Sequence, residues 1–335
     1  MRIGIIGAGA VGGTIAALLD RAGHDVAVTA RGEGLAAIRE NGLRFDGAWG
    51  EHIAHVEASE RLEAAPEIAF VCTKAQDAAS ALRANAEHLH RIPVVIVQNG
   101  LESLEVAADI LPDSQLVGAL ALYAAQYVEP GHVTVTASGS TYLGNGTGTP
   151  DGAPAPEAKR VAALLDPVMP ALATANFVGA QWSKLVINMV NAMPALTGLS
   201  VQETIRDAGL GRVVTASMRE TVRIGLASGV RYATLQGLND PMLRLFAALP
   251  LRAAHSLPAL MARRMGGVPN LGSTLQSRRR GRTTEIDYLN GAVVRAAGAI
   301  GRAAPVNEAI VDAMHRLERE GTFLSRDEAA ALPTS

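Results

Sequence analysis

A glycine-rich turn near the start of the chain constrains the fold more than any other feature. The apolar run Arg2–Gly7 predicts a strand, and it continues as Gly7-Ala8-Gly9-Ala10-Val11-Gly12 into a segment with helical spacing. In this context Gly7 permits a tight turn, Gly9 lets a pyrophosphate approach the backbone, and Gly12 lets the helix pack closely on the strand. The helix N-terminus adds N–H groups and a positive partial charge. The pattern predicts a dinucleotide site; a glycine turn without a ligand is the alternative.

The next strand ends in an arginine, which bears on the choice of cofactor. Enzymes that use NAD usually place Asp or Glu about 20 residues after the glycines to hold the ribose 2′-hydroxyl. Here the expected strand Asp25–Ala30 is followed by Arg31. A carboxylate would repel a 2′-phosphate, whereas a guanidinium can bind it through two hydrogen bonds. We therefore predict NADP(H). The alternative is a solvated loop arginine, one of 27 that accompany only three lysines.

Short apolar strands alternate with helices through the first half of the chain. The further strands expected are Glu67–Thr73, Pro93–Gln98 and Val133–Leu143, and the helices expected are Val11–Arg21 and Ala75–Leu89. This alternation predicts a parallel sheet covered on both faces. Gly144–Pro156 is a Gly- and Pro-rich loop. We place it inside the same domain because a helix (Lys159–Leu172) and a strand (Ala175–Val178) are expected after it.

After Gln181 the pattern becomes helical and stays helical. Helices are expected at Gln181–Met193, Leu210–Leu226, Asp240–Leu251, Thr284–Ile300 and Val306–Arg319. The predicted fold class is therefore α/β. Residues 1–180 are expected to form an NADP-binding domain with a Rossmann-type doubly wound parallel sheet. Residues 181–335 are expected to form an all-α domain that carries substrate-binding and catalytic groups.

Composition excludes several classes of protein. A chain of 335 residues is long enough for two domains. Its net charge of −2 argues against a nucleic-acid-binding protein. The single cysteine excludes a disulfide framework and a cysteine-based metal centre, and the histidines lack companion ligands, so no metal is expected. No apolar run reaches the roughly 18 residues that span a membrane, and we expect no leader before the first strand. We expect a soluble cytoplasmic protein that binds no membrane.

Polar residues at two places are candidates for the chemistry. Lys74 and Asn99 each follow an expected strand, and the carboxyl ends of parallel strands face the ligand. Lys184 shares a face of its helix with Asn188 and Asn191, which suits the wall of a substrate cleft. Each group has a plainer alternative. The first two residues can be caps or loop residues, and the helix stripe can face solvent.

Glu285 stands at the start of an expected helix. Thr284 and Asp287 have the spacing of a capping box, and the helix dipole favours an ionised carboxylate in the first turn. Such a carboxylate is suited to hold a cation or a hydroxyl. The alternative is that Glu285 only complements the dipole.

The motifs together resemble one family, the ketopantoate reductases (2-dehydropantoate 2-reductases), over nearly the whole chain. The resemblance is carried by GAGAVG, Arg31, TKAQD around Lys74, QNG around Asn99, WSKLVIN around Lys184 and Asn188, STLQ at Ser273 and TEIDYLNG at Glu285. It implies NADPH-dependent reduction of 2-dehydropantoate to pantoate, as in pantothenate biosynthesis. It also implies that hydride goes to the 2-keto carbon and that a lysine is the general acid.

The resemblance also implies roles for single residues. The general acid is the residue that matches Lys184. Cofactor contacts beyond the glycine turn and Arg31 fall on Lys74, Asn99, Ala124 and Glu285. Substrate contacts fall on Asn99, Lys184, Asn188 and Ser273.

One position departs from the family pattern. The family commonly has a substrate-binding Asn eight residues after the lysine, and here that residue is Ala192. Either the adjacent Asn191 takes its place as a substrate ligand, or the substrate is another branched 2-oxo acid. A third alternative is a non-catalytic NADP-binding regulator. The expected partner is a small 2-oxo acid, and the apolar C-terminal helices are compatible with a homodimer.

Overall fold

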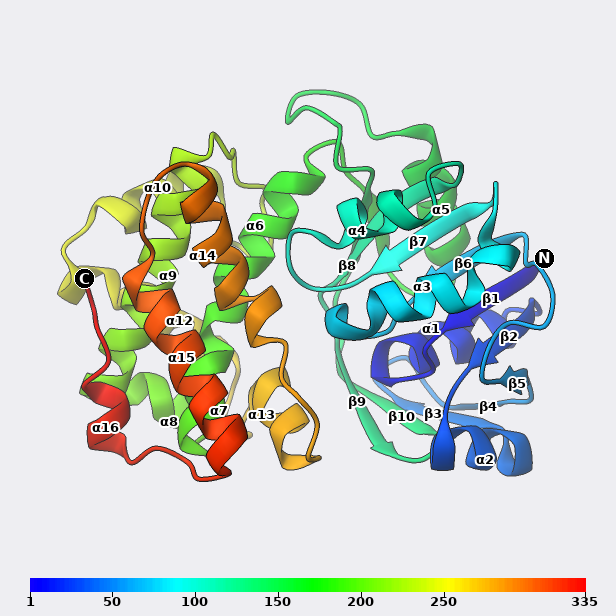
Figure 1. The fold of residues 1–335 in the computed structure, drawn as a ribbon, viewed down its shortest axis with the longest axis horizontal. Coiled ribbons are helices and arrows are strands. Elements are labelled where there is room, and N and C mark those ends of the chain that lie inside the picture. The colour runs from blue at the N-terminus through cyan, green and yellow to red at the C-terminus, as the bar shows by residue number, and fades with distance from the viewer. The chain divides into compact units, whose positions relative to one another are not determined.

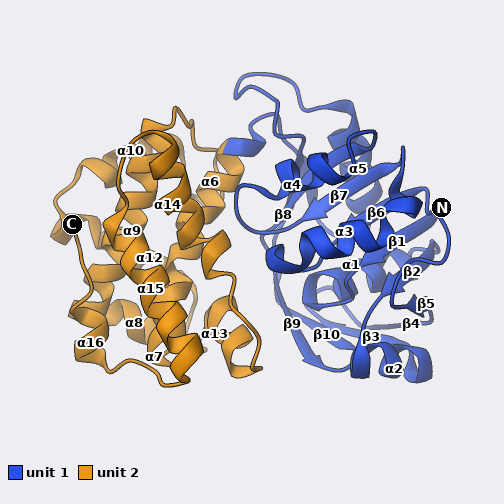
Figure 2. Cartoon of the chain, in the orientation of Figure 1, with its two compact units in different colours: residues 1–178 blue, residues 179–335 orange.

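The computed structural model describes residues 1–335, and the chain divides into two compact units, Met1–Val178 and Gly179–Ser335 (Figure 1, Figure 2). The division falls inside helix α6 (Phe177–Asn188). The boundary predicted from the sequence lies near residue 180.

The first unit is built on an eight-stranded sheet with strand order β12-β11-β8-β7-β6-β1-β2-β5. The strands are β1 (Arg2–Ile6), β2 (Asp25–Thr29), β5 (Glu57–Ser59), β6 (Ile68–Val71), β7 (Pro93–Val97), β8 (Gln115–Ala121), β11 (Thr141–Gly144) and β12 (Ala171–Ala173). The six strands from β8 to β5 pair in parallel, and only β11 runs antiparallel to its neighbour β8. Neighbours that are not consecutive in the chain require crossover connections. The prediction of a Rossmann-type doubly wound sheet is confirmed.

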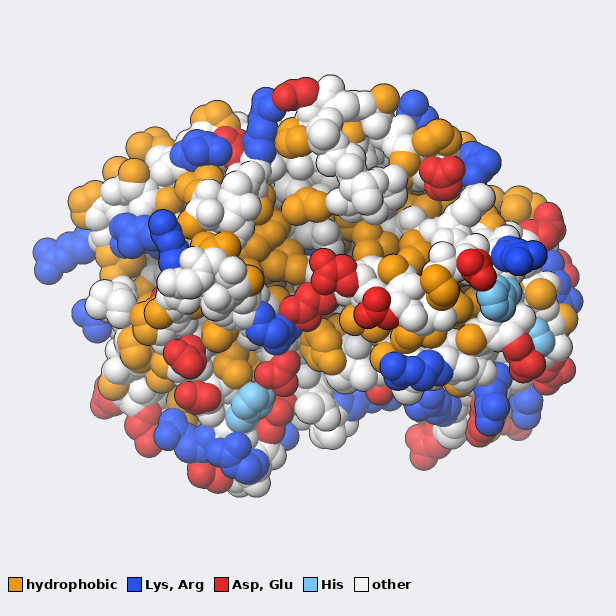
Figure 3. All heavy atoms as spheres, turned by 45° about the horizontal axis from the view of Figure 1, so that its top comes forward, with side chains coloured by type: hydrophobic (Ala, Val, Ile, Leu, Met, Phe, Trp, Pro, Cys, Tyr) orange, Lys and Arg blue, Asp and Glu red, His pale blue; other side chains and the backbone are white.

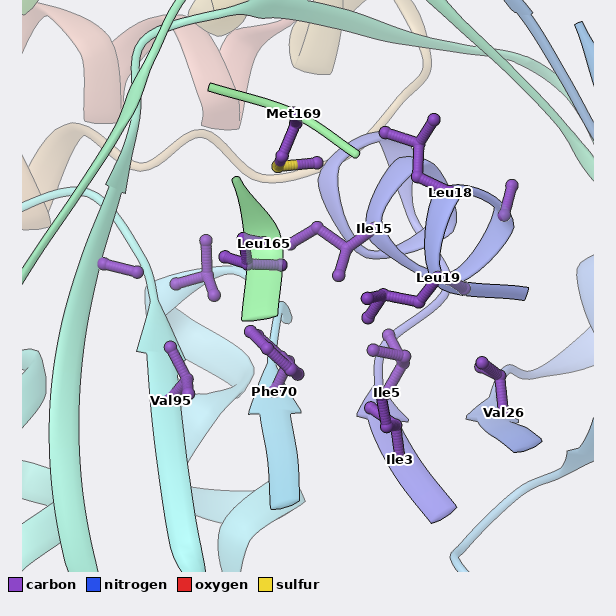
Figure 4. Packing of buried hydrophobic residues seen from close by; sticks show 14 of the residues in the cluster. Ile3, Ile5, Ile15, Leu18, Leu19, Val26, Phe70, Val95, Leu165 and Met169 are labelled. Carbon is purple, nitrogen blue, oxygen red and sulfur yellow. The ribbon is translucent and has the colours of Figure 1, made fainter. Parts of the chain in front are cut away.

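Helices cover both faces of this sheet. They are α1 (Ala10–Arg21), α2 (Gly32–Asn41), α3 (Ala75–Leu89), α4 (Ser103–Ile110) and α5 (Pro156–Leu165). Successive strand residues enter two separate cores: Ile5 packs in the core with α1 and α5, and Ile6 packs in the core with α3 and α4. Figure 4 shows the first core, where α1 places Ile15 and Leu19 over Ile5 and Phe70. Each such fully buried side chain stabilises the fold by about 1.5–3 kcal/mol.

A second, smaller sheet was not predicted. Its order is β4-β3-β10-β9, formed by β3 (Leu43–Gly47), β4 (His52–Ala54), β9 (Ala124–Glu129) and β10 (His132–Ala137). It packs against α1: a Cβ on Gly13 would lie 2.9 Å from Cγ1 of Val133. The glycine therefore lets helix and sheet approach closely. Of these strands only β10 overlaps Val133–Leu143, the segment where the sequence predicted extended structure.

The end of the first unit corrects two predictions. The helix expected over Lys159–Leu172 ends at Leu165: Asp166 still has helical backbone (φ −57°, ψ −33°), but Pro167 has no N–H to continue the helical hydrogen bonds. The strand expected at Ala175–Val178 is wrong. The edge strand β12 lies at Ala171–Ala173, and Phe177 already begins α6.

The second unit is helical, as predicted. Its elements after α6 are η1 (Met189–Asn191), α7 (Ala192–Thr197), α8 (Val201–Arg206), α9 (Ala208–Ala227), α10 (Asp240–Ala248), α11 (Leu251–Ala254), α12 (Ser256–Arg264), α13 (Gly272–Arg279), η2 (Ile286–Tyr288), α14 (Asn290–Ala299), α15 (Pro305–Glu320) and α16 (Arg326–Ala330), where η marks 3₁₀ turns. Helix α9 is central and contacts α8, α10, α14, α15 and α16.

A buried polar cluster joins α9, α14 and α15. Asn307 is fully buried; its Oδ1 accepts hydrogen bonds from Ser217 Oγ (2.8 Å) and from Asn290 Nδ2 (2.9 Å). Its Nδ2 donates to Glu220 Oε2 at 2.7 Å. The same carboxylate accepts the first free N–H groups of α15, from Val306 (3.1 Å) and Asn307 (2.8 Å). The cluster therefore satisfies buried polar groups and caps a helix at once.

The surface carries a mixture of charges. On the face drawn in Figure 3, acidic and basic side chains lie in small groups among apolar atoms. None of the helices has the length and hydropathy that crossing a membrane requires.

Candidate functional site

The glycine turn has the backbone geometry that the sequence predicts. Gly7 has φ +98°, and its N–H donates to Thr29 Oγ1 at 3.0 Å. A Cβ on Gly12 would overlap the carbonyl oxygen of Gly7, so the first turn of α1 needs glycine there. Gly9 is different, because no heavy atom lies within 4 Å of where its Cβ would be. The turn therefore leaves open space at Gly9, which fits a pyrophosphate against the backbone and the N-terminus of α1.

Arg31 lies at the carboxyl end of β2, beside the glycine turn. It is exposed and precedes α2. Thr29, two residues earlier, accepts hydrogen bonds from Gly7 N–H at its hydroxyl and from Ala8 N–H at its carbonyl. Sequence reasoning missed this role of Thr29; its place at the tip of β2 was the available signal. The neighbouring ends of β1 and β2 thus bring the glycine turn and Arg31 to one edge of the sheet.

Lys74 and Asn99 lie at the same edge of the first unit. Both are half-buried and follow the adjacent parallel strands β6 and β7. Lys74 is the N-cap residue of α3. Ala124 is exposed at the start of β9 in the smaller sheet. The structure therefore gathers the turn, Arg31, Lys74 and Asn99 along four neighbouring strand ends.

Lys184 lies on α6 in the second unit and is half-buried. Its neighbours Leu185 and Val186 are buried, so α6 packs its apolar faces into the unit. Burial disfavours the charged ammonium and lowers the pKa of Lys184 to about 8, while the carboxylate of Glu285 acts in the opposite direction. A lysine in this state can donate a proton near neutral pH and exists partly as the free amine.

The helix that carries Lys184 is shorter than predicted. It ends at Asn188, and Met189–Asn191 form a 3₁₀ turn before α7, so the helix expected up to Met193 is wrong. A 3₁₀ turn has about three residues per turn, which changes the direction of Asn191 relative to an α-helix.

Asn191 lies against the segment that carries Ser273. Its Oδ1 would be 2.6 Å from a Cβ on Gly272, a residue with φ +67°. Ser273 follows directly and is exposed at the start of α13. Ala192, in contrast, is only 2% exposed. The structure therefore places the side chain of Asn191 beside Gly272, next to Ser273.

Glu285 is close enough to Lys184 for its carboxylate to raise the pKa of the lysine. The helix predicted to begin at Thr284, however, is wrong at its start. Glu285 precedes the 3₁₀ turn Ile286–Tyr288, and α14 begins only at Asn290. The expected capping box is absent: Thr284 Oγ1 is buried without a hydrogen-bond partner, and Asp287 Oδ1 binds His315 Nε2 at 3.0 Å. The dipole of a long helix therefore does not account for Glu285, whose carboxylate acts on Lys184.

Two segments of the chain match one protein family. Residues 3–148 match "Ketopantoate reductase PanE/ApbA", and residues 176–318 match "Ketopantoate reductase PanE/ApbA C terminal". The chain belongs to the ketopantoate reductase family. The resemblance stated from the motifs is confirmed, and the chain is an oxidoreductase by family.

Members of the ketopantoate reductase family from several organisms align over the full length. The 2-dehydropantoate 2-reductase of Halobacterium salinarum is 30% identical, with 96% of this chain and 100% of the relative covered. That of Archaeoglobus fulgidus is 29% identical, covering 95% and 98%. The crystal structure of a PanE/ApbA family ketopantoate reductase from Ralstonia eutropha superposes with a TM-score of 0.76 at 27% identity, covering 96% of this chain and 99% of that one.

One structural neighbour has another substrate in its name. D-mandelate dehydrogenase with NADH superposes with a TM-score of 0.78 at 21% identity, which shows a shared fold alone. Ketopantoate reductases as a family depend on a pyridine nucleotide, and the open space at Gly9 fits such a group. No set of three or more His, Cys, Asp or Glu side chains is grouped to hold a metal ion.

Proposed function

We propose that the chain catalyses the NADPH-dependent reduction of 2-dehydropantoate to pantoate, as in pantothenate biosynthesis. The observation that carries this proposal is Lys184, a half-buried lysine whose pKa is lowered to about 8 and which interacts with Glu285. Full-length relatives named 2-dehydropantoate 2-reductase support the same reaction. The first unit is then the NADP-binding domain, and the second carries the catalytic lysine.

The cofactor is assigned to the edge of the first unit. Residues Gly7 to Gly12 would hold the pyrophosphate, and Arg31 the 2′-phosphate. The remaining cofactor contacts of the proposal are Lys74, Asn99, Ala124 and Glu285. When bound, NADPH supplies the hydride for the 2-keto carbon.

Lys184 supplies the proton. Addition of hydride to the 2-keto carbon leaves negative charge on its oxygen, and the Lys184 ammonium donates a proton there to complete the alcohol. The contacts that hold the 2-oxo acid are assigned to Asn99, Asn188, Asn191 and Ser273, together with Lys184. Asn191 is included because its carboxamide lies beside Gly272 and Ser273.

Replacing Arg31 should change the preference for the cofactor. In Arg31→Ala the 2′-phosphate loses charged hydrogen bonds worth about 1.5–3 kcal/mol, so NADPH affinity should fall roughly 10- to 100-fold while NADH affinity stays constant. Fluorescence titration with both nucleotides measures the ratio. Arg39→Ala is the matched control, because Arg39 of α2 binds the carbonyl of Ala58 at 2.8 Å. Equal losses for NADH and NADPH would contradict the assignment.

The pH dependence of reduction should report the Lys184–Glu285 pair. Because the proton comes from the ammonium, kcat/KM should be constant below the pKa and fall as the pH rises through about 8. The carboxylate raises the pKa, so Glu285→Gln should shift the fall to lower pH. Asp287→Asn is the control, because Asp287 binds His315 instead. An unshifted profile in Glu285→Gln argues against the pairing.

A second candidate is reduction of another branched 2-oxo acid, which Ala192 favours. An alanine offers no polar atom where the family commonly has an Asn. Oxidation of NADPH with a panel of 2-oxo acids tests both candidates. Turnover of 2-dehydropantoate supports the first, and selective turnover of another acid supports the second. Tight NADPH binding with no turnover of any acid would instead support a non-catalytic regulator and contradict both reductase candidates.

A further inference from the structure

The strands that precede Lys74 and Asn99 stop pairing before either residue is reached. In the parallel ladder of β6 and β7, the last pair is Val71 with Ile96. Two residues further along each strand are Thr73 and Gln98, which therefore stand opposite one another. Lys74 and Asn99 come next. Main-chain pairing alone does not fix the separation of the two segments at this point.

The side chain of Gln98 bridges the two segments. Its Nε2 donates to the carbonyl oxygen of Thr73 at 3.0 Å and lies 3.5 Å from Thr73 Oγ1. Gln98 is only 7% exposed, so this hydrogen bond is shielded from water. The side-chain amide thus continues the cross-strand hydrogen bonding for one more step.

Thr73 in turn packs against the glycine turn. A Cβ on Gly7 would lie 2.9 Å from Thr73 Cγ2 and 3.0 Å from its backbone nitrogen. The preceding residue is tied to β1, because Cys72 N–H donates to the Ile6 carbonyl at 2.8 Å. The position of Thr73 is therefore fixed on the side of β1, and Gln98 transmits that position to the end of β7.

We infer that Gln98 is a positioning residue that holds the Lys74 and Asn99 segments at a fixed separation beside the glycine turn. The inference rests on the proposed function, in which Lys74 and Asn99 contact the cofactor. Gln98 acts through these two residues. The amide oxygen, Oε1, is buried without a protein hydrogen-bond partner, so the hydrogen bonds of this side chain to the protein are those that Nε2 makes to Thr73.

The experiment compares Gln98→Met with Gln98→Glu. Methionine keeps the volume and removes the donor, so kcat with the 2-oxo acid should fall roughly 10- to 100-fold, because a displacement of about 1 Å at a reacting group costs as much. Glutamate keeps the shape but donates only when protonated. Its kcat should therefore recover as the pH falls toward the pKa of the introduced carboxyl, whereas Gln98→Met should show no recovery.

Asn85→Leu is the matched control. Asn85 is also a buried amide of the first unit, 2% exposed, and its Oδ1 accepts from Leu62 N–H at 2.8 Å, remote from the strand ends. Gln98→Met and Asn85→Leu both remove side-chain hydrogen bonds of a buried amide, so both should lose thermal stability. Only Gln98→Met should lose kcat per folded molecule, which a purely structural role would not produce.

Each result decides the inference. Wild-type kcat and NADPH affinity in Gln98→Met would overturn it, as would an equal loss of kcat in Asn85→Leu. If the wild-type chain reduces no 2-oxo acid, the proposed function fails. The inference is then decided by NADPH affinity: weaker binding in Gln98→Met than in Asn85→Leu supports it, and equal binding overturns it.

Discussion

Lys184→Arg should lower kcat by about 10²- to 10⁴-fold, the contribution typical of a positioned general acid, while NADPH affinity stays near that of the wild type. The substitution keeps the positive charge but removes the ability to release a proton, because a guanidinium stays protonated throughout the accessible pH range. The lysine differs from an arginine in this respect, because burial lowers the pKa of Lys184 to about 8 and lets it release a proton near neutral pH. Steady-state kinetics with the best 2-oxo acid and a fluorescence titration of NADPH measure the two quantities.

The control for this substitution is Lys159→Arg. Lys159 is an exposed lysine of α5 in the first unit, so the same chemical change there should leave kcat unaltered. A Lys184→Arg enzyme with wild-type kcat would eliminate the lysine as the proton donor. A loss of NADPH affinity equal to the loss of kcat would instead assign Lys184 to cofactor binding.

Gly9→Ala should weaken NADPH binding roughly 10- to 100-fold, the equivalent of about 1.5–3 kcal/mol of charged hydrogen bonding, without changing the melting temperature. The added methyl group meets no protein atom within 4 Å, so the fold accepts it. The backbone of Gly9 is extended, with φ −81° and ψ −161°, and alanine adopts this without strain. The methyl group would occupy only the space proposed for the pyrophosphate.

Gly12→Ala provides the contrast. Its Cβ would overlap the carbonyl oxygen of Gly7 and lie 2.8 Å from Cys72 Cβ, so the first turn of α1 must shift. Overpacking of this kind costs about 1–3 kcal/mol, and the melting temperature should fall. Thermal unfolding and NADPH titration of the two variants separate cofactor binding from folding. Unaltered NADPH affinity in Gly9→Ala would contradict the assignment of the pyrophosphate to this turn.

The parallel sheet was predictable because its central strands are buried on both faces and therefore appear as apolar runs, such as Pro93–Val97. The smaller sheet was not. Strand β9 (Ala124–Glu129) has no fully buried residue, and β4 has three residues, so neither gives a hydrophobic pattern. Their pairing depends on packing against α1, which local sequence does not encode.

At the candidate site, the identity of the polar residues was predictable but part of their geometry was not. The pattern around Lys184 predicted one helix through Met193, whereas a 3₁₀ turn at Met189–Asn191 redirects Asn191 toward Gly272. Thr284 and Asp287 have capping-box spacing, yet tertiary contacts to α15 prevail: Thr284 N–H binds Glu318 Oε1 at 2.8 Å. Contacts between distant segments outweigh local propensity in both cases.

The polar cluster of Ser217, Glu220, Asn290 and Asn307 has a consequence for how the second unit opens. Its four side chains come from α9, α14 and α15, so separating one of these helices leaves buried groups unsatisfied on the other two. The three helices are therefore expected to open as one cooperative element, with amides that exchange with solvent together. Asn290 follows Glu285 by five residues. The acidic partner of the lysine is thus tethered next to the element expected to resist local unfolding longest.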